Sequence, residues 1–418
     1  MAVLDPVLKR LVRNGSLRVI DWKGQSTLYG DGTQKPVTIR VHDAVTAAKL
    51  IFDPQMAVGE AYMDGRLTVE DGTLFDFIEI GMKNIGRAPF SYPLSGLTER
   101  LRTGLRRLGQ FNPASRSKAN VAHHYDLSDG LYDLFLDVDR QYSCAYVMTP
   151  NDTIETAQAQ KKRHIAAKLL IEPHHRVLDI GSGWGGLGLY LADISGADVT
   201  GLTLSKEQHG VSNERAAKAG VAGRVRFKLQ DYRAEEAQYD RIVSVGMFEH
   251  VGINHFDAYF RKIAEALTDD GVALIHAIGR CDGPGHTNPW ITKYIFPGGY
   301  CPALSEVLPS IEKTGLLVTD VEILRLHYAE TLRMWRERFD INRDKIRALY
   351  DERFCRMWEF YLITSELAFR YQGQMVFQIQ LAKQTQTVPM TRDYIAEFEE
   401  RHPPANVLAP VLRNQKAA

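Results

Sequence analysis

Residues 176–186 read Arg-Val-Leu-Asp-Ile-Gly-Ser-Gly-Trp-Gly-Gly, and this stretch decides the fold class. An apolar segment, Val177–Ile180, runs into a glycine-rich turn and then into a helical pattern of apolar residues at 187–191. A strand, a glycine turn and a helix in this order form the nucleotide-binding unit of a parallel α/β sheet. Glycines in such a turn let the backbone approach a bound cofactor closely, because they carry no Cβ.

Two details beside the glycine turn bear on which cofactor it binds. The spacing Gly181-x-Gly183-x-x-Gly186 also satisfies a dinucleotide-binding fingerprint. Asp179, two residues before the first glycine, is typical of methyltransferases that bind S-adenosylmethionine (SAM). The next strand, Asp198–Thr203, ends without the carboxylate that a nicotinamide enzyme places on a ribose. The segment favours SAM, and a nicotinamide oxidoreductase is the alternative.

From about residue 120 onward, strand and helix patterns alternate as in a doubly wound parallel sheet. Strands are expected at 176–180, 198–202, 225–229, 241–245 and 272–278, and helices at 184–194, 205–219 and 255–267. Residues 333–384 are rich in aromatic side chains and are expected to be largely helical. The predicted fold class is therefore α/β with a Rossmann-like sheet, which binds ligands at the carboxyl ends of its strands.

The first 80 or so residues predict a separate, smaller α+β unit. A strand pattern at 36–41 precedes a helical stretch at 44–52 and several Asp-Gly turn signals. The window from Lys83 to Lys118 then holds eight lysines and arginines against a single acid, Glu99, with leucines at helical spacing from 97 to 108. This pattern predicts either a basic amphipathic helix on an anionic bilayer or a helix docked on a neighbouring domain.

The composition argues against several classes of function. Lysine plus arginine and aspartate plus glutamate both number 51, and a net charge of zero does not favour nucleic-acid binding. No apolar run approaches the roughly 20 residues of a membrane-spanning helix, and charges interrupt any signal-peptide core. The four cysteines lack CxxC spacing and are expected to be reduced thiols of a cytosolic protein. The histidine pairs 123–124 and 174–175 are expected to diverge, so no metal site is expected.

Polar residues follow the second and third strands of the predicted sheet. Ser205 is a helix N-cap candidate, with Gln208 completing a capping box. The alternative, functional interpretation places the Thr203–Leu204 backbone and the Gln208 side chain near the ribose or methionine of SAM. At the third strand end, the Asp231 carboxylate is a candidate for the adenine amino group, and Tyr232 for covering the ring.

The fourth and fifth strands carry the candidates for chemistry. Glu249 and His250 follow the fourth strand, in a segment flanked by glycines. His276 lies within the otherwise apolar fifth strand, where it is either a satisfied core residue or a functional one. Because the carboxyl ends of parallel strands meet at one edge of a sheet, Glu249 and His276 are expected to face the same site.

Several stretches together resemble the cyclopropane-fatty-acyl-phospholipid synthase family. They are, besides the glycine turn, residues 120–126, 141–146, 200–205, 230–233, 247–252, 296–300 and 327–332. Residues 59–65 are similar to the N-terminal domain of that family, which resembles lipid-carrier folds. The resemblance implies a lipid-engaging domain at 1–110, a linker at 111–120, a SAM-dependent catalytic domain at 121–400 and a tail at 401–418.

The family moves a carbon from SAM onto a cis double bond of an acyl chain in a membrane phospholipid, which gives a cyclopropane fatty acid. Its base is a bound bicarbonate, whose cage corresponds here to Cys144 and Ile278 through their main chains, and to Glu249, His276 and Tyr328. A protonated Glu249, or one sharing a proton with the anion, would avoid a clash of two negative charges. The SAM contacts correspond to Tyr142, Ser143, Gly181, Ser182, Gly183, Thr203, Leu204, Gln208, Asp231 and Tyr232.

The resemblance also implies a homodimer that is cytoplasmic and associates peripherally with the inner face of a bacterial membrane. Ser365 stands where some members carry a cysteine once proposed to be catalytic, so no nucleophilic cysteine is expected. Two alternatives stay open at this point. The product is a methylene- or methyl-branched chain if the base sits elsewhere, or the chain is a non-catalytic lipid-binding protein that retains a SAM fold.

Overall fold

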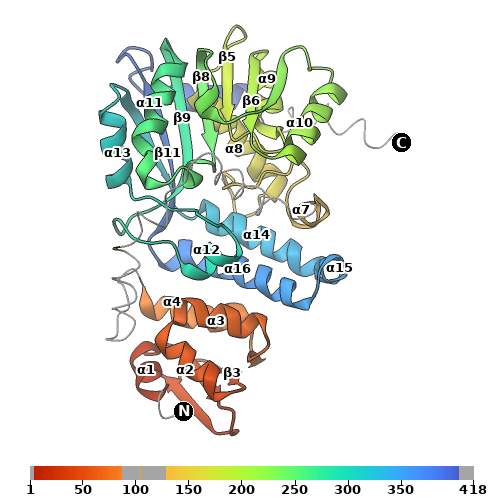
Figure 1. Cartoon of the computed structure of the whole chain (residues 1–418), viewed down its shortest axis with the longest axis vertical. Coiled ribbons are helices and arrows are strands. Elements are labelled where there is room, and N and C mark those ends of the chain that lie inside the picture. The colour runs from red at the N-terminus through yellow and green to blue at the C-terminus, as the bar shows by residue number, and fades with distance from the viewer. Residues whose placement is uncertain (1–3, 87–103, 105–128, 404–418) are drawn as a thin grey trace. The chain divides into compact units, whose positions relative to one another are not determined.

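A computed structural model of the chain describes residues 4–86, 104 and 129–403. The chain divides into two compact units (Figure 1). One comprises residues 1–109, 285–297 and 332–374, and the other comprises residues 110–284, 298–331 and 375–418. Most of the basic window at 83–118, the 120–126 motif, the histidine pair 123–124 and most of the predicted tail lie outside the described residues.

The second unit is built on a seven-stranded sheet with the order β10-β11-β9-β8-β5-β6-β7. Its strands are β5 (Arg176–Ile180), β6 (Asp198–Thr203), β7 (Val225–Leu229), β8 (Tyr239–Val245), β9 (Leu267–Arg280), β10 (Leu317–Leu324) and β11 (Gln374–Ala382). Strand β5 pairs in parallel with β6 and β8, which pair in parallel with β7 and β9, respectively, whereas β10 and β11 are antiparallel. The chain order reverses at β5, and such a switch point is where doubly wound sheets bind ligands.

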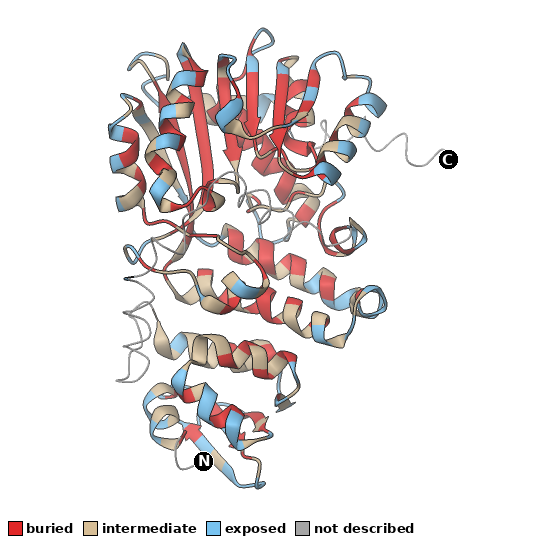
Figure 2. Ribbon diagram, in the orientation of Figure 1, coloured by how far each residue is buried: buried red, intermediate tan, exposed pale blue. Residues whose placement is uncertain are grey.

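Helices cover both faces of this sheet, because alternate residues of the strands enter two separate cores. On β9, Ile275 and Ala277 belong to a core with α11 and α13, whereas Leu274 packs with α8 and α9 on the opposite face. Figure 2 shows the central strands almost entirely buried, as this two-sided packing requires. The helices of the unit are α7 (Asp129–Phe135), α8 (Ile154–Lys168), α9 (Gly186–Ser195), α10 (Lys206–Lys218), α11 (Phe256–Ala266), α13 (Leu304–Glu312) and α17 (Asp393–Arg401).

The predicted α/β sheet is confirmed, and all five predicted strands are present within a few residues of their expected ends. The prediction that residues 333–384 are largely helical is wrong at its end, where residues 374–382 form strand β11. In this strand Phe377 and Ile379 alternate with Gln378 and Gln380, and every residue after the first is buried. An alternation of apolar and polar residues ordinarily indicates that one face of a strand is exposed. Here both faces of the strand are covered, so the glutamines are buried as well. Strand β10 was not predicted.

The first unit contains a four-stranded sheet with the order β2-β1-β3-β4, which confirms the predicted α+β character of the N-terminal segment. Its strands are β1 (Ser16–Ile20), β2 (Ser26–Gly30), β3 (Val37–Val41) and β4 (Leu67–Asp71), and the helices of the segment are α1 (Asp5–Leu11), α2 (Ala44–Phe52), α3 (Pro54–Met63) and α4 (Leu74–Ile85). No helix among the described residues is long and apolar enough to cross a membrane.

Later helices pack with this N-terminal segment in the same unit. They are α12 (Pro289–Tyr294), α15 (Arg343–Leu349), α16 (Glu352–Tyr371) and the part of α14 (His327–Ile341) beyond residue 331. Helix α16 contacts α3, where the Tyr62 hydroxyl donates a hydrogen bond to Glu359 over 2.8 Å. The aromatic side chains Trp335 and Trp358 are fully buried, so they serve packing in this unit. The sequence-based domain boundaries stay a prediction.

Candidate active site

The glycine turn joins β5 to α9 and is anchored on the end of β6. The backbone N–H groups of Gly181 and Ser182 both donate to the Leu202 carbonyl, over 3.0 and 2.8 Å. Gly181 and Gly183 have φ values of +86° and +53°. A residue with a Cβ adopts such a backbone conformation only at a cost in free energy. The turn is therefore held at the switch point of the sheet by its own backbone.

Only part of the turn leaves room for a ligand. A Cβ built on Gly181 would lie 2.8 Å from Met247 Cβ, and one on Gly186 would lie 2.4 Å from an Asp139 carboxylate oxygen. A Cβ on Gly183 would have no atom of the described residues within 4 Å. The lack of a Cβ at Gly181 and Gly186 is therefore required by the packing of the protein itself. Gly183 is the one of these three that faces open space.

The segment after β6 has a clear structural role. The Ser205 hydroxyl accepts a hydrogen bond from the Gln208 N–H over 3.3 Å and caps α10, as predicted. The predicted capping box does not close, because the Gln208 side chain accepts from the Thr203 hydroxyl instead, over 3.0 Å. The Ser205 N–H donates to the same hydroxyl. Thr203 and Gln208 are buried and Leu204 is half-buried, so this segment is rigid where a SAM contact was predicted.

The end of β7 is tied to the end of β6, since the Gln230 N–H donates to the Thr203 carbonyl over 3.1 Å. The Asp231 carboxylate accepts hydrogen bonds from the backbone and the guanidinium of Arg233, at 2.6–3.0 Å. This fixes the orientation of the carboxylate beside the Tyr232 ring, which packs edge-on against Tyr259. The contacts of Asp231 with the adenine amino group and of Tyr232 with the adenine ring stay predictions.

A loop at residues 141–147 is held against this edge of the sheet by two buried polar residues of α8. Lys161 Nζ donates to Gln141 Oε1 and to Ser143 Oγ, both over 2.8 Å. Gln158 Nε2 donates to the Ser143 carbonyl over 2.9 Å. A Cβ built on Gly246, which follows β8, would lie 3.8 Å from Ser143 Cβ. The predicted contacts Tyr142, Ser143 and Cys144 therefore lie beside the end of β8.

Glu249 lies in the turn after β8 and points its carboxyl group at β9. Its Oε1 accepts a hydrogen bond from the Ile278 N–H over 2.6 Å, while its Oε2 is buried and has no partner among the residues that the structure describes. Burial raises the pKa of Glu249 to about 7. The Ile278 N–H thus bonds to Glu249, and the contribution of the Ile278 main chain to an anion cage stays a prediction.

His276 enters the same region from β9. The strand register pairs Val245 with His276, and the Gly246 N–H donates to the His276 carbonyl over 2.9 Å. The residue is 2% exposed, and its Nε2 atom is buried with no partner within residues 4–86 and 129–403. Because burial lowers the pKa of His276 to about 3, the imidazole is neutral at ordinary pH. The structure therefore confirms that Glu249 and His276 share one edge of the sheet.

Tyr328 is placed by the first turn of α14, which binds the 141–147 loop. The Ala145 N–H donates to the Thr331 hydroxyl over 3.0 Å, and the Val147 N–H donates to His327 Nδ1 over 2.9 Å. Tyr328 lies between these two anchors and is 6% exposed. The loop that carries Cys144 and the turn that carries Tyr328 are thus one packed assembly.

The described cysteines include no activated thiol at this site. All four cysteines of the chain are free, and Cys144 is completely buried. Burial raises the pKa of the Cys144 thiol far above its ordinary value, so it stays protonated. A protonated thiol is a poor nucleophile, which agrees with a role for its main chain alone.

The expectation that adjacent histidines diverge is wrong at His174 and His175. Their rings lie 4.5 Å apart, and with Glu172 they bring three possible ligand atoms within 4.8 Å of one another. The His175 Nδ1 atom already accepts a hydrogen bond from the Glu172 N–H over 2.9 Å. This cluster lies in the loop before β5 and shares no contact with Glu249 or His276. The expected absence of a metal cofactor stays a prediction.

The buried Glu249 carboxyl predicts a pH-dependent stability difference. A carboxyl whose folded pKa is raised contributes stability below its ordinary pKa, here 4.5, and this contribution is lost as the pH rises through about 7. A Glu249→Gln variant stays neutral, so its free energy of unfolding is expected to exceed that of the wild type by about 3 kcal/mol near pH 8. The difference should vanish near pH 4. Urea unfolding at several pH values measures it, and a difference independent of pH would contradict the assignment.

Several residues that build the site were not predicted. Lys161 and Gln158 hold the 141–147 loop, and Thr331 ties this loop to α14. Gln378 of β11 contacts His276. Nothing in the local pattern marks these residues, since a helix rich in lysine, arginine and glutamine ordinarily predicts an exposed surface.

Two family models match the chain. One, described as mycolic acid cyclopropane synthetase, matches residues 113–379, and one described as a domain of unknown function matches residues 3–87. The cyclopropane-fatty-acyl-phospholipid synthase of Escherichia coli K12 is 36% identical over 348 residues, covering 82% of this chain and 87% of the relative. A tuberculostearic acid methyltransferase of Mycobacterium tuberculosis is 35% identical over 396 residues, covering 92% of this chain and 91% of the relative.

A solved structure also matches the chain. The mycolic acid cyclopropane synthase CmaA1, complexed with SAH and CTAB, superposes with a TM-score of 0.60 at 33% identity and covers 65% of this chain and 99% of that one. These matches decide between the two cofactors that the glycine spacing allowed, in favour of SAM. The chain therefore belongs to the mycolic acid cyclopropane synthetase family and is a SAM-dependent methyltransferase.

Proposed function

We propose that the protein transfers a methylene group from SAM to cis double bonds of unsaturated acyl chains in membrane phospholipids, giving cyclopropane fatty acids. Bound bicarbonate acts as the base. The similarity to the Escherichia coli synthase over most of both chains supports the reaction and the substrate class. The observation that carries the proposal is that two polar atoms near the carboxyl ends of β8 and β9, Glu249 Oε2 and His276 Nε2, are buried with no hydrogen-bond partner in the part of the chain that the structure describes.

Glu249 and His276 are suited to binding a small oxyanion. A buried polar atom without a partner is costly, so two of them at one sheet edge point to a polar ligand. A neutral His276 can donate one hydrogen bond to an anion. With its pKa raised to about 7, Glu249 holds a proton over part of the ordinary pH range and can donate it to an anion's oxygen. The cage thus accepts a negative ion without placing two full charges in contact.

When bound, SAM supplies an electrophilic methyl group and bicarbonate supplies the base that removes a proton from the added carbon. The alkene is a weak and uncharged nucleophile, so the protein contributes mainly positioning and exclusion of water. Gly183 leaves room for the cofactor, and the Asp231–Tyr232 pair orients its adenine. Glu249 and His276 hold the base, and Tyr328 orients it.

The reaction predicts a specific product. Purified protein, methyl-labelled SAM and vesicles of phospholipid with cis-unsaturated chains are expected to yield labelled cyclopropane fatty acids that are one CH₂ heavier than the substrate. Gas chromatography with mass spectrometry against cyclopropane standards identifies them. Removing bicarbonate from the buffer is expected to reduce the rate, and adding it back to restore the rate. Absence of labelled lipid, with SAM still bound, would contradict the proposal.

A second candidate product is a methylene- or methyl-branched chain. The 35% identity to the tuberculostearic acid methyltransferase over 92% of this chain supports this second candidate. Branched and cyclopropane products separate in the same chromatographic analysis, so one assay distinguishes the two. A branched product would agree with the proposed SAM site and would contradict the proposed position of the base.

The proposed setting is the cytoplasmic face of the membrane, where the protein associates peripherally as a homodimer. The N-terminal domain engages lipid in this proposal, together with the basic window at 83–118. Flotation with vesicles of increasing anionic lipid content tests the membrane association, and light scattering tests the dimer. Vesicle binding that changes with neither the anionic lipid content nor the salt concentration would contradict an electrostatic contribution.

A further inference from the structure

Two glutamines on β11 are completely buried, and their surroundings differ. Gln380 uses both ends of its amide. Its Nε2 donates to the Lys168 carbonyl and the Tyr394 hydroxyl over 2.6 and 2.9 Å, and its Oε1 accepts from the Thr319 hydroxyl over 2.8 Å. Gln380 therefore serves as a structural link between neighbouring elements.

Within the described part of the chain, the Gln378 side chain makes one hydrogen bond. Its Nε2 lies 3.2 Å from His276 Nδ1, whereas its Oε1 is buried and no described residue bonds to it. An apolar residue of the same size would avoid the cost of that unpartnered oxygen. The contact with His276 is the feature that an apolar residue would lose.

The direction of this hydrogen bond decides where the histidine proton lies. An amide nitrogen can only donate, so His276 Nδ1 must accept, and a neutral ring then carries its proton on Nε2. We propose that Gln378 is a positioning residue that holds His276 in the Nε2–H tautomer and thereby turns a hydrogen-bond donor toward the anion in the cage. This inference rests on the proposed function, because the anion is the bicarbonate of that proposal.

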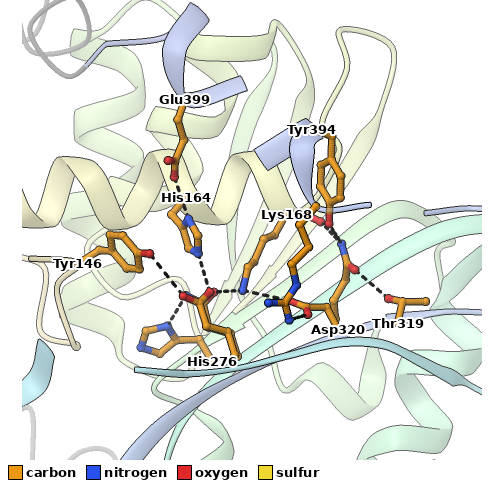
Figure 3. A network of polar contacts seen from close by, with 12 residues as sticks. Tyr146, His164, Lys168, His276, Thr319, Asp320, Tyr394 and Glu399 are labelled. Carbon is orange, nitrogen blue, oxygen red and sulfur yellow. Dashed lines mark hydrogen bonds and ion pairs between the residues drawn. The ribbon is translucent and has the colours of Figure 1, made fainter. Parts of the chain in front are cut away.

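The surroundings of His276 make the choice of tautomer matter. Figure 3 shows His276 beside a polar network that includes Lys168 and His164. Burial, with further contributions from Lys161, Lys168 and His164, lowers the pKa of His276, which keeps the ring neutral. A neutral ring has one N–H group. With the proton on Nδ1, the Nε2 lone pair would face the anion and repel it.

The proton position is measurable without substrate. In protein labelled with ¹⁵N at histidine, the His276 resonances are assigned by their loss in a His276→Asn variant. Unliganded wild type is expected to show a protonated Nε2 and an unprotonated Nδ1. In Gln378→Met, which keeps the size of the side chain and removes the donor, the two tautomers are expected to mix. Gln380→Met is the matched control, expected to lose stability but to keep the His276 tautomer.

Kinetics then link the tautomer to the anion. Gln378→Met is expected to raise the KM for bicarbonate at least about tenfold, the loss of one hydrogen bond, with kcat at saturating bicarbonate and the KM for SAM little changed. A protonated Nδ1 in the wild type overturns the proposal, as does a Gln378→Met variant with unchanged tautomer and unchanged KM. If the wild type is active and its rate does not depend on bicarbonate, the assignment of bicarbonate as the base fails instead. The tautomer measurement does not depend on that assignment.

Discussion

A Glu249→Gln variant is expected to lose activity by about two orders of magnitude or more, while its affinity for SAM stays within about threefold. Glutamine keeps the hydrogen bond from the Ile278 N–H, because its amide oxygen replaces Oε1. It cannot share a proton with a base bound at Oε2, and correctly placed proton transfer is worth about 10²–10⁴ in rate. Initial rates with saturating SAM, together with calorimetric titration of SAM, separate the two effects.

Glu366→Gln provides a matched control for this variant. Glu366 is also buried, but its carboxylate pairs with Arg336 and Arg370 within the first unit. This substitution is expected to lower stability and to leave turnover per folded molecule nearly unchanged. Full activity in Glu249→Gln would remove Glu249 from the cage, whatever the control shows.

The second large effect concerns the glycine turn. Gly181→Ala is expected to lower the free energy of unfolding by about 2–4 kcal/mol, because the new Cβ meets Met247 at 2.8 Å and the residue keeps a positive φ. Gly183→Ala has the positive φ but no clash, so it is expected to cost only about 1 kcal/mol. Its added methyl instead occupies the space assigned to the cofactor and should weaken SAM binding at least about tenfold.

Chemical denaturation and SAM titration on both alanine variants test this contrast. The expected pattern is a stability defect in Gly181→Ala and an affinity defect in Gly183→Ala. The reverse pattern would place the cofactor on the other side of the turn. Equal defects in both measurements would show that the turn acts only as a structural unit.

Much of the sheet could be predicted because its strands and helices carry simple patterns. Buried strands such as 176–180 are mostly apolar, and a glycine turn directly after a strand marks the switch point of the sheet. Strand β11 could not be predicted, because Gln378 and Gln380 interrupt its apolar pattern and suggest an exposed segment. Their burial depends on partners outside the strand, namely His276 for the first and Lys168, Thr319 and Tyr394 for the second.

Part of the candidate site could be predicted from the sequence, and part could not. Glu249 and His276 were predicted to share an edge because parallel strands end together, and the structure confirms this. The assignment of bicarbonate and the individual SAM contacts came from the family resemblance and stay predictions. Lys161 escaped prediction because a lysine in a polar helix ordinarily faces solvent. It is buried here because the 141–147 loop folds over α8.

The burial of Cys144 has a consequence for how inhibition by thiol reagents is interpreted. Cys144 stands in the candidate site, but its thiol is inaccessible and protonated, whereas Cys281 is exposed. Alkylating reagents and mild oxidants should therefore modify Cys281 first. A loss of activity after such treatment would report a bulky group attached to a surface residue after β9, and it would carry no information about a covalent step in methyl transfer.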